Sequence, residues 1–355
     1  MMKTAFWRPL LLVSALLLSV SVGGVESPAE ASCGSASCFV VIGSQQQVSP
    51  AGVFTVNLSY AYTPNEIPPD GAATIPFSNQ QTKQLLLANS QVSQLSTLVR
   101  TATLDINYGL TERIGLAVAV PYRYVTAIGQ IGAGAVASSD DRGIGDVMAK
   151  VKYNLLPTLR SMVVLEMGVY FPTGDYGYEG SPGQLLESSL QVGKGTFGFQ
   201  PGFYQTYEML PHRLNQFLSG HWRYNLRNSD GYQSGQEYAL NTGLNLVTLP
   251  WLTFTGQFNF RYKTKDTIES QLFEFQGAPF NRQVLLDGNL LNRPVPTTNS
   301  TYLAFSTGVV VNVFDYGQLY AIAQLPLYRD FNGNLQQGVG YVFGMTKHFA
   351  TTPLF

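Results

Sequence analysis

The chain has 355 residues, enough for one large domain or two ordinary ones. Only 12% of them are charged, about half the ~25% typical of soluble domains, whereas aromatic residues also reach 12%. A formal net charge of −1, with no block of Lys and Arg, argues against a nucleic-acid partner. No internal apolar run approaches the ~18 residues of a spanning helix. A lipid-embedded barrel explains a chain that is apolar yet lacks such helices.

The N-terminus has the parts of a secretory signal. Lys3 and Arg8 precede an apolar run from Leu10 to Val22, and Ala29-Glu30-Ala31 supplies a small-x-small exit. We therefore predict that residues 1–31 are a signal peptide, cleaved after Ala31. A lipoprotein signal ending at Cys33 is the alternative, but Glu30 occupies a position where such a signal carries an aliphatic residue.

Residues 32–52 are predicted to form a periplasmic N-terminal leader. This leader holds the two cysteines of the chain, Cys33 and Cys38. An exported chain meets an oxidising compartment, so we predict a small disulfide loop between them. A metal site or redox pair has no His or acidic residue nearby to support it, and we predict neither a metal nor a cofactor.

Twelve segments follow in which apolar side chains alternate with small polar ones, the pattern of strands with one apolar and one polar face. In the first, Phe54 and Leu58 share a face opposite Thr55 and Asn57. The predicted strands are 53–62, 98–108, 114–124, 143–153, 161–171, 196–209, 217–225, 236–247, 252–263, 300–311, 319–327 and 339–349.

The connections between these strands alternate in length. The short turns are 109–112, 154–160, 210–216, 248–251 and 312–318, and the mostly longer loops are 63–97, 125–142, 172–195, 226–235, 264–299 and 328–338. Short turns at one end and long loops at the other are typical of bacterial outer-membrane barrels, with the short turns periplasmic. We therefore predict an all-β, antiparallel transmembrane barrel of about twelve strands over residues 53–349, in the bacterial outer membrane. An even strand number places both termini on the periplasmic side.

A soluble β-sandwich is the alternative fold, but its outward face would be rich in Lys, Glu and Asp. Here the polar face carries mostly Thr, Ser, Asn, Gln and Gly, as expected of a wet lumen. Aromatic residues near strand ends fit interfacial girdles; they are Tyr60, Tyr62, Tyr108, Tyr122, Tyr124, Tyr153, Tyr224 and Tyr262. Phe349 closes the last strand and Phe355 ends the tail 350–355, and either can serve as the signal for the barrel-assembly machinery.

Charged and ionisable residues on the polar face are the candidate pore-lining residues. They are Asp105, Arg123, Asp146, Lys150, Lys152, Glu166, Glu208, His221, Arg223, Glu237, Arg261 and Lys263. Opposite charges in a narrow interior are expected to pair, because an isolated charge there is costly. Such residues either stiffen the wall or set selectivity, and the sequence leaves both open. His221 is the candidate base for an enzymatic alternative, but no Gly-x-Ser-x-Gly elbow accompanies it, and we predict no enzyme.

One loop carries a pattern of its own. Leucines and Val92 recur at loosely helical spacing between Leu85 and Leu98 in loop 63–97. This segment is expected either to fold inward as a constriction or to form a surface helix.

Three phrases resemble the outer-membrane family linked to meta-pathway phenol degradation. They are Tyr108-Gly-Leu-Thr-Glu-Arg-Ile-Gly-Leu-Ala-Val-Ala-Val-Pro-Tyr122, Gly143-Ile-Gly-Asp-Val-Met-Ala-Lys-Val-Lys-Tyr153 and Phe171-Pro-Thr-Gly174. The resemblance implies an outer-membrane barrel that takes up aromatic or other hydrophobic compounds. We therefore expect a passive channel in contact with outer-membrane lipid and a small-molecule solute, of unspecified oligomeric state. A non-selective pore and a scaffold barrel that binds an exported partner are the alternatives.

Overall fold

The computed structural model describes residues 46–66, 92–131, 135–158, 160–176, 179–181, 184–185, 191–229, 231–268, 293–294, 298–313, 317–331 and 335–351. Cys33 and Cys38 lie outside these residues, as does the signal segment 1–31. Among the described residues, no helix is long and apolar enough to cross a membrane.

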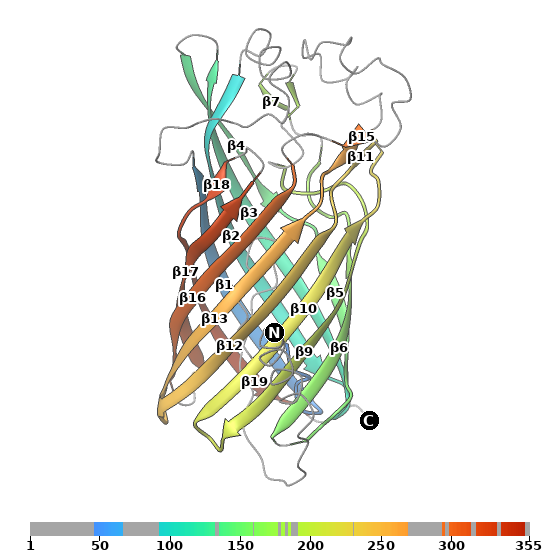
Figure 1. Cartoon of the computed structure of the whole chain (residues 1–355). Coiled ribbons are helices and arrows are strands. Elements are labelled where there is room, and N and C mark those ends of the chain that lie inside the picture. Colours follow the sequence, from blue (N-terminus) through green and yellow to red (C-terminus); the bar gives the residue numbers. More distant parts are fainter. Residues whose placement is uncertain are drawn as a thin grey trace, which may run out of the picture.

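The described residues form a closed barrel of twelve long antiparallel strands (Figure 1). Each strand pairs with two others, and β1 closes the cylinder by pairing with both β2 and β19; Phe54, for example, lies opposite Tyr108 on one side and Phe349 on the other. The predicted twelve-stranded antiparallel barrel is confirmed. Its strands are β1 Val53–Glu66, β2 Val92–Gly109, β3 Ile114–Ile131, β5 Met148–Asn154, β6 Ser161–Tyr170, β9 Gly198–Leu210, β10 Leu214–Asn225, β12 Glu237–Leu249, β13 Leu252–Lys263, β16 Ser300–Asn312, β17 Gln318–Asp330 and β19 Gly340–Ala350.

Seven further strands in the described part of the chain lie at the end of the barrel that carries the long connections. β4 (Ala135–Ile144) pairs with β3, and β18 (Gln336–Gln337) pairs with β1. β11 (Tyr232–Gln233), β14 (Thr267–Ile268) and β15 (Arg293–Pro294) form a separate three-stranded sheet. The remaining two, β7 (Glu179–Ser181) and β8 (Gln184–Leu185), pair with each other. This end of the barrel is therefore partly ordered by its own hydrogen bonds.

Two local predictions were wrong. Most of segment 125–142, expected to be a loop, continues the barrel as the hairpin of β3 and β4. The strand expected over 143–153 is instead interrupted at 145–147, where the carboxylate of Asp146 turns to bind backbone N–H groups of another loop. Apolar and polar residues alternate in both segments, so this periodicity alone does not distinguish a loop from a strand.

The constriction or surface helix predicted for Leu85–Leu98 is wrong for residues 92–98. Residues from Val92 onward belong to β2, and Leu98 lies opposite Pro64 of β1. Cross-strand hydrogen bonds with β1 and β3 override the weak helical spacing. Residues 85–91 lie outside the described part of the chain.

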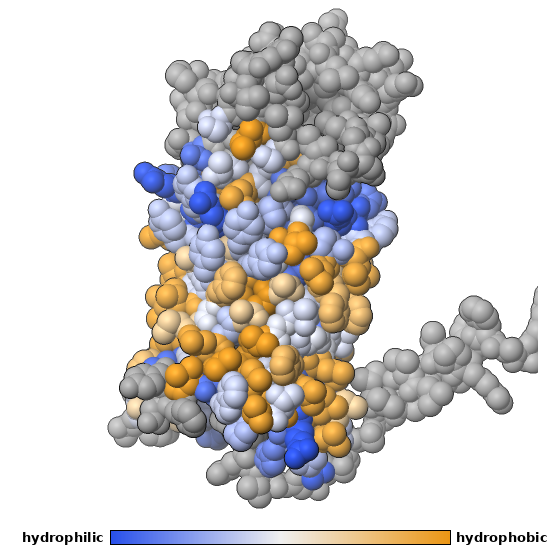
Figure 2. Space-filling view, turned by 90° about the vertical axis from the view of Figure 1, so that its left-hand side faces the viewer, coloured by the Kyte–Doolittle hydropathy of each residue, from blue (hydrophilic) through white to orange (hydrophobic). Residues whose placement is uncertain are grey.

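The outer surface is apolar around the middle of the barrel. Figure 2 shows a band of hydrophobic side chains with hydrophilic residues above it and at its lower edge. Leu58, Phe258 and Phe343 are each about half exposed on the outer surface. Exposed large apolar side chains on every barrel strand except β16 are stable only in lipid. The barrel fold and this band place the chain in the bacterial outer membrane, as predicted.

The inner surface is polar and hydrogen-bonded. Asn57 accepts bonds from Tyr320 and Thr346, each at 2.9 Å, and donates to Asp105 at 3.2 Å. Tyr320 reaches across because Gly344 lacks a side chain; a Cβ there would overlap the tyrosine ring. Asn259 likewise bonds both Asn241 (2.8 Å) and Ser306. These cross-strand bonds satisfy polar groups that would be costly if buried alone.

Candidate solute pathway through the barrel

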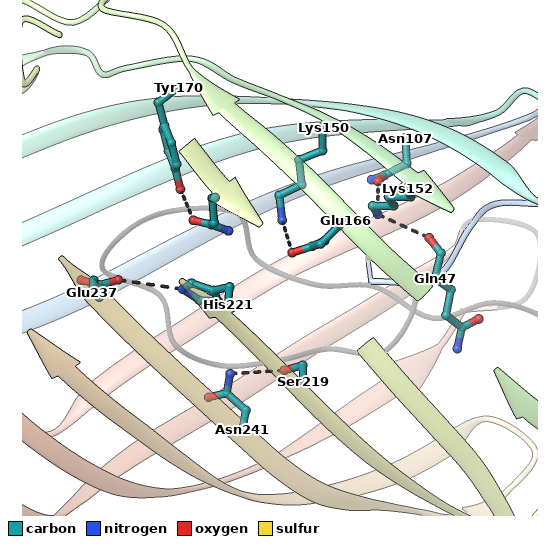
Figure 3. Close-up of polar contacts among 11 residues, drawn as sticks. Gln47, Asn107, Lys150, Lys152, Glu166, Tyr170, Ser219, His221, Glu237 and Asn241 are labelled. Atoms are coloured by element: carbon teal, nitrogen blue, oxygen red, sulfur yellow. Dashed lines mark hydrogen bonds and ion pairs between the residues drawn. The ribbon is translucent and has the colours of Figure 1, made fainter. Parts of the chain in front are cut away.

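A buried ion pair lies in the periplasmic half of the lumen. Lys150 on β5 and Glu166 on β6 place Nζ and Oε1 3.0 Å apart, with side chains 11% and 4% exposed. Lys152, two residues further along β5, donates to Asn107 Oδ1 at 2.7 Å (Figure 3). Asp105 faces the same space from β2. Two ammonium groups and two carboxylates thus occupy this level, which leaves it close to neutral.

The segment before β1 lies against the inner wall at this level. Val48 packs on Val164, Tyr204 and Phe217, all of which point into the lumen. The carbonyl oxygen of Gln47 accepts a hydrogen bond from Lys152 Nζ at 3.3 Å (Figure 3). Residues 46–52, which the sequence analysis assigned to the leader, therefore occupy part of the periplasmic end of the lumen.

Glycine makes room for this segment. A Cβ on Gly109 would lie 2.6 Å from the carbonyl carbon of Pro50 and closer still to two carbonyl oxygens. Ser49 adds a 3.1 Å bond to Thr55. The segment is therefore held by one apolar side chain and several hydrogen bonds, and its only ladder contact with the wall is an isolated bridge between Ala51 and Gly109.

A second segment, 191–194, folds against the inner wall nearer the extracellular end. The backbone N–H groups of Gly174 and Lys194 donate to the two oxygens of Asp146, at 3.2 and 3.0 Å. The N–H of Val192 donates to Asp141 at 2.9 Å, and Arg123 donates to the carbonyl of Val192 at 3.2 Å. Two carboxylates and a guanidinium thus bind a stretch of backbone that is not paired with any strand of the sheet.

Two of the phrases that carry the family resemblance meet here. Thr173, from Phe171-Pro-Thr-Gly174, accepts from the N–H of Val147 at 2.8 Å and donates to the carbonyl of Gly145 at 2.9 Å. Gly174 itself approaches Gly193 so closely that a Cβ on either would collide with the other's backbone. The phrases therefore specify how an inward loop is attached to the wall.

Arginine side chains at this level stack on aromatic rings. The guanidinium carbon of Arg223 lies 3.9 Å from the ring centroid of Tyr170, and that of Arg261 lies 5.4 Å from Tyr302. Tyr170 donates its hydroxyl to Gln200 at 2.8 Å, which fixes the ring. Cation–π contacts of this kind are worth about 0.5–2 kcal/mol. They keep the arginines close to the wall.

His221 and Glu237 face each other on β10 and β12, with Nε2 and Oε1 3.9 Å apart (Figure 3). No hydroxyl nucleophile is bonded to His221 among the described contacts. In the part of the chain that the structure describes, no group of three or more His, Cys, Asp or Glu side chains is placed to hold a metal ion. The site consists of polar and charged wall residues.

The predicted pore-lining residues divide by position. Lys150, Lys152, Glu166 and Asp105 gather in the periplasmic half. Arg123, Asp146, His221, Arg223, Glu237, Arg261 and Lys263 lie further toward the extracellular end, where Lys263 pairs with Asp266 at 2.8 Å. Glu208 is apart from both groups: its carboxylate accepts from the backbone of His212 in a periplasmic turn.

Sequence reasoning missed the segments that narrow the lumen, namely residues 46–52 and 191–194. It also missed Asp141 and Lys194, because both fall in stretches expected to be loops. The available signal was the Gly-Ile-Gly-Asp phrase, in which two glycines beside an aspartate indicate a bend with a carboxylate free to bind backbone. Nothing in the composition of residues 46–52 points to the lumen.

Comparison with known proteins supports this architecture. The family described as "Putative MetA-pathway of phenol degradation" matches residues 77–286. No curated protein sequence matches the chain. Among solved structures, the COG4313 outer membrane channel from Pseudomonas putida F1 has 13% identity and a TM-score of 0.58, covering 86% of this chain and 98% of its own.

Other solved barrels are less similar. The NanC porin has 9% identity and a TM-score of 0.40 over 83% of this chain and 98% of its own. The CymD monoaromatic hydrocarbon channel has 8% identity and a TM-score of 0.38 over 85% and 90%. These structures are channels and porins, and at such identities the similarity concerns the fold. Since the family match spans more than half of the sequence, the chain belongs to the family described as "Putative MetA-pathway of phenol degradation".

Proposed function

We propose that this protein is a passive outer-membrane channel for small solutes, with aromatic compounds as its preferred class. The observation that carries the proposal is the way the lumen is narrowed. Residues 46–52 and 191–194 are attached to the wall by hydrogen bonds and by Val48, and apart from an isolated bridge between Ala51 and Gly109 they do not join the β-sheet. Segments held in this way can move aside while the barrel stays intact.

The cost of moving Gln47 and Val48 away from the wall follows from their contacts. Exposing Val48 costs about 1.5–3 kcal/mol. Losing the bond from Lys152 to the Gln47 carbonyl costs about 1.5–3 kcal/mol, because the donor is charged. A total of about 4 kcal/mol corresponds to an open population on the order of one in a thousand. That is low enough to limit leakage and high enough to allow transient passage.

The preference for aromatic compounds rests on the family description, which names phenol degradation. The two alternatives are a pore without preference and a scaffold barrel that binds an exported partner.

The test uses protein purified from outer membranes and reconstituted in lipid vesicles and planar bilayers. We expect discrete conductance steps and vesicle swelling by small solutes, both absent from protein-free membranes. Val48→Asp should increase both, because a charge in that apolar cluster disfavours the inward position. A wild-type barrel that passes no ion and no solute would contradict the channel and favour the scaffold. Equal passage of aromatic and non-aromatic solutes would favour the unselective pore.

A further inference from the structure

Two arginines lie on the outer surface of the barrel, in one row across neighbouring strands. Arg100 of β2 and Arg142 of β4 are both cross-strand partners of Tyr124 on β3, and Tyr62 of β1 is the other partner of Arg100. Directly paired residues of neighbouring strands point to the same face of a sheet. This is the face of the exposed Leu104, four residues from Arg100 on β2. We call Tyr62, Arg100, Tyr124 and Arg142 the outer arginine row.

The row lies at the extracellular edge of the apolar band. Tyr124 is ten residues along β3 from Ile114, where the strand begins beside a periplasmic turn. At about 3.4 Å per residue and a strand tilt of about 40°, this separation gives a height of about 25 Å, which is the height of the apolar band in outer-membrane barrels. Two residues nearer the periplasm, Tyr122 and Ile144 are still about half exposed on the same face. Figure 2 shows hydrophilic residues above the band. The row is therefore level with the headgroups of the outer leaflet.

Neutral groups hold the guanidinium of Arg100. Its carbon lies 4.0 Å from the ring centroid of Tyr124, and Nη2 donates to Thr126 Oγ1 at 3.1 Å. Its Nε is buried without a hydrogen-bond partner. This position brings the guanidinium of Arg100 over β3 and so toward Arg142 on β4, since adjacent strands lie about 4.8 Å apart. Both side chains can therefore contact one group of the size of a phosphate.

The charge of the two arginines is only partly balanced. Among the residues that the structure describes, neither Arg100 nor Arg142 forms an ion pair. The nearby carboxylate on this face is that of Asp140, which accepts a hydrogen bond from the Tyr124 hydroxyl at 3.2 Å. Asp141 is buried and binds the backbone of the inward segment 191–194. Two cations and one carboxylate leave the row with a net positive charge.

From this arrangement we propose that the outer arginine row binds a phosphate group of lipopolysaccharide, the phosphorylated glycolipid of the outer leaflet. Guanidinium groups match phosphate oxygens with paired hydrogen bonds. Tyrosines beside them suit the boundary between acyl chains and headgroups. The acyl chains of such a lipid would cover Tyr122 and Ile144, which a soluble anion would leave exposed. The site is on the outside of the barrel, so it is independent of the channel function.

The experiment compares two lipids that differ only in phosphate. They are bisphosphorylated lipid A, which is the membrane-embedded part of lipopolysaccharide, and lipid A from which both phosphates have been removed. The protein is purified from outer membranes and exchanged into detergent micelles, and native mass spectrometry counts the lipids bound at increasing concentration. One interfacial arginine contributes about 1 kcal/mol toward an anionic lipid, so we expect wild type to prefer bisphosphorylated lipid A at least about fivefold.

Two double variants locate the site. Arg100→Gln, Arg142→Gln should bind both lipids equally, because the guanidinium groups that meet the phosphate are gone. Arg113→Gln, Lys347→Gln is the matched control: it removes the same charge near the periplasmic ends of β3 and β19, and it should keep the preference of wild type. Heat-modifiable electrophoretic mobility verifies that each variant has folded.

Each contrary outcome overturns the proposal in a recognisable way. Equal binding of the two lipids by wild type, or a preference that survives in Arg100→Gln, Arg142→Gln, shows that the row does not bind lipid phosphate. A preference lost to the same extent in the periplasmic control shows that total charge is responsible. Displacement of lipid A by inorganic phosphate at the same concentration assigns the row to free phosphate. Conductance is measured separately, so none of these results depends on whether the barrel is a channel.

Discussion

The attachment of segment 191–194 can be tested with a single methyl group. In Gly193→Ala the new Cβ would lie 2.5 Å from the carbonyl carbon of Gly174 and 2.8 Å from its Cα. Both are backbone atoms, so no side-chain rotation relieves the overlap. Carbon atoms pack best about 3.5–4.0 Å apart, so the two segments must separate by about 1 Å.

That separation reaches the bonds to Asp146. They are 3.2 Å long to the N–H of Gly174 and 3.0 Å long to the N–H of Lys194. A further ~1 Å takes them beyond hydrogen-bond range. Each bond to a carboxylate is worth about 1.5–3 kcal/mol, so the attachment weakens by about 3–6 kcal/mol if both are lost. We expect segment 191–194 to leave the wall and the channel to conduct better.

Single-channel conductance in planar bilayers measures this effect. Gly143→Ala is the matched control, because its Cβ would meet only a methyl group of Val192 at an ordinary 3.8 Å. The control should conduct as wild type. If Gly193→Ala folds and its conductance is unchanged or reduced, segment 191–194 does not narrow the pathway.

Three further predictions concern the barrel itself. Glu166→Gln leaves Lys150 as an unpaired buried cation and should destabilise the barrel by about 3–5 kcal/mol in urea unfolding from lipid, whereas the double variant Lys150→Met, Glu166→Gln should lose much less. A single and a double variant of equal stability would refute that pairing. Phe258→Arg, on the lipid face, should cost about 2–4 kcal/mol, and Thr242→Arg, which also faces outward opposite Phe258, should act in the same direction; full tolerance of Phe258→Arg would contradict the assigned face. Gly344→Ala should displace Tyr320 from Asn57 and lower stability by about 1–3 kcal/mol through a buried group left unpaired, and an unchanged unfolding midpoint would show that the ring has room.

The barrel was predictable because its signal is local. In each strand the alternation of apolar and polar residues indicates which side faces lipid. Leu58 and Phe258 lie on the outward face that this alternation predicts. A closed sheet then follows, since backbone groups in lipid must be paired within the protein. Segment 125–142 shows the limit of this reasoning, because a loop and a hairpin that extends the barrel can have the same composition.

The charged lumen residues were predictable in face but not in partner. Alternation placed Lys150 and Glu166 on the inner wall, yet their pairing depends on the register between β5 and β6. Arg223 lies opposite Glu237 across β10 and β12, and it also stacks on Tyr170 of β6, whose ring centroid lies 3.9 Å from its guanidinium carbon. Register is a property of the assembled sheet.

What the sequence determined by itself is the compartment, the class of fold, the number of barrel strands and the face of nearly every wall residue, because each follows from a period of two repeated along the chain. Only the tertiary structure decided how the lumen is narrowed. Residues 46–52 and 191–194 carry no periodic pattern, and their positions depend on groups distant in sequence, such as Lys152 for the first and Asp146 for the second. Contacts of that kind exist only once the barrel has closed.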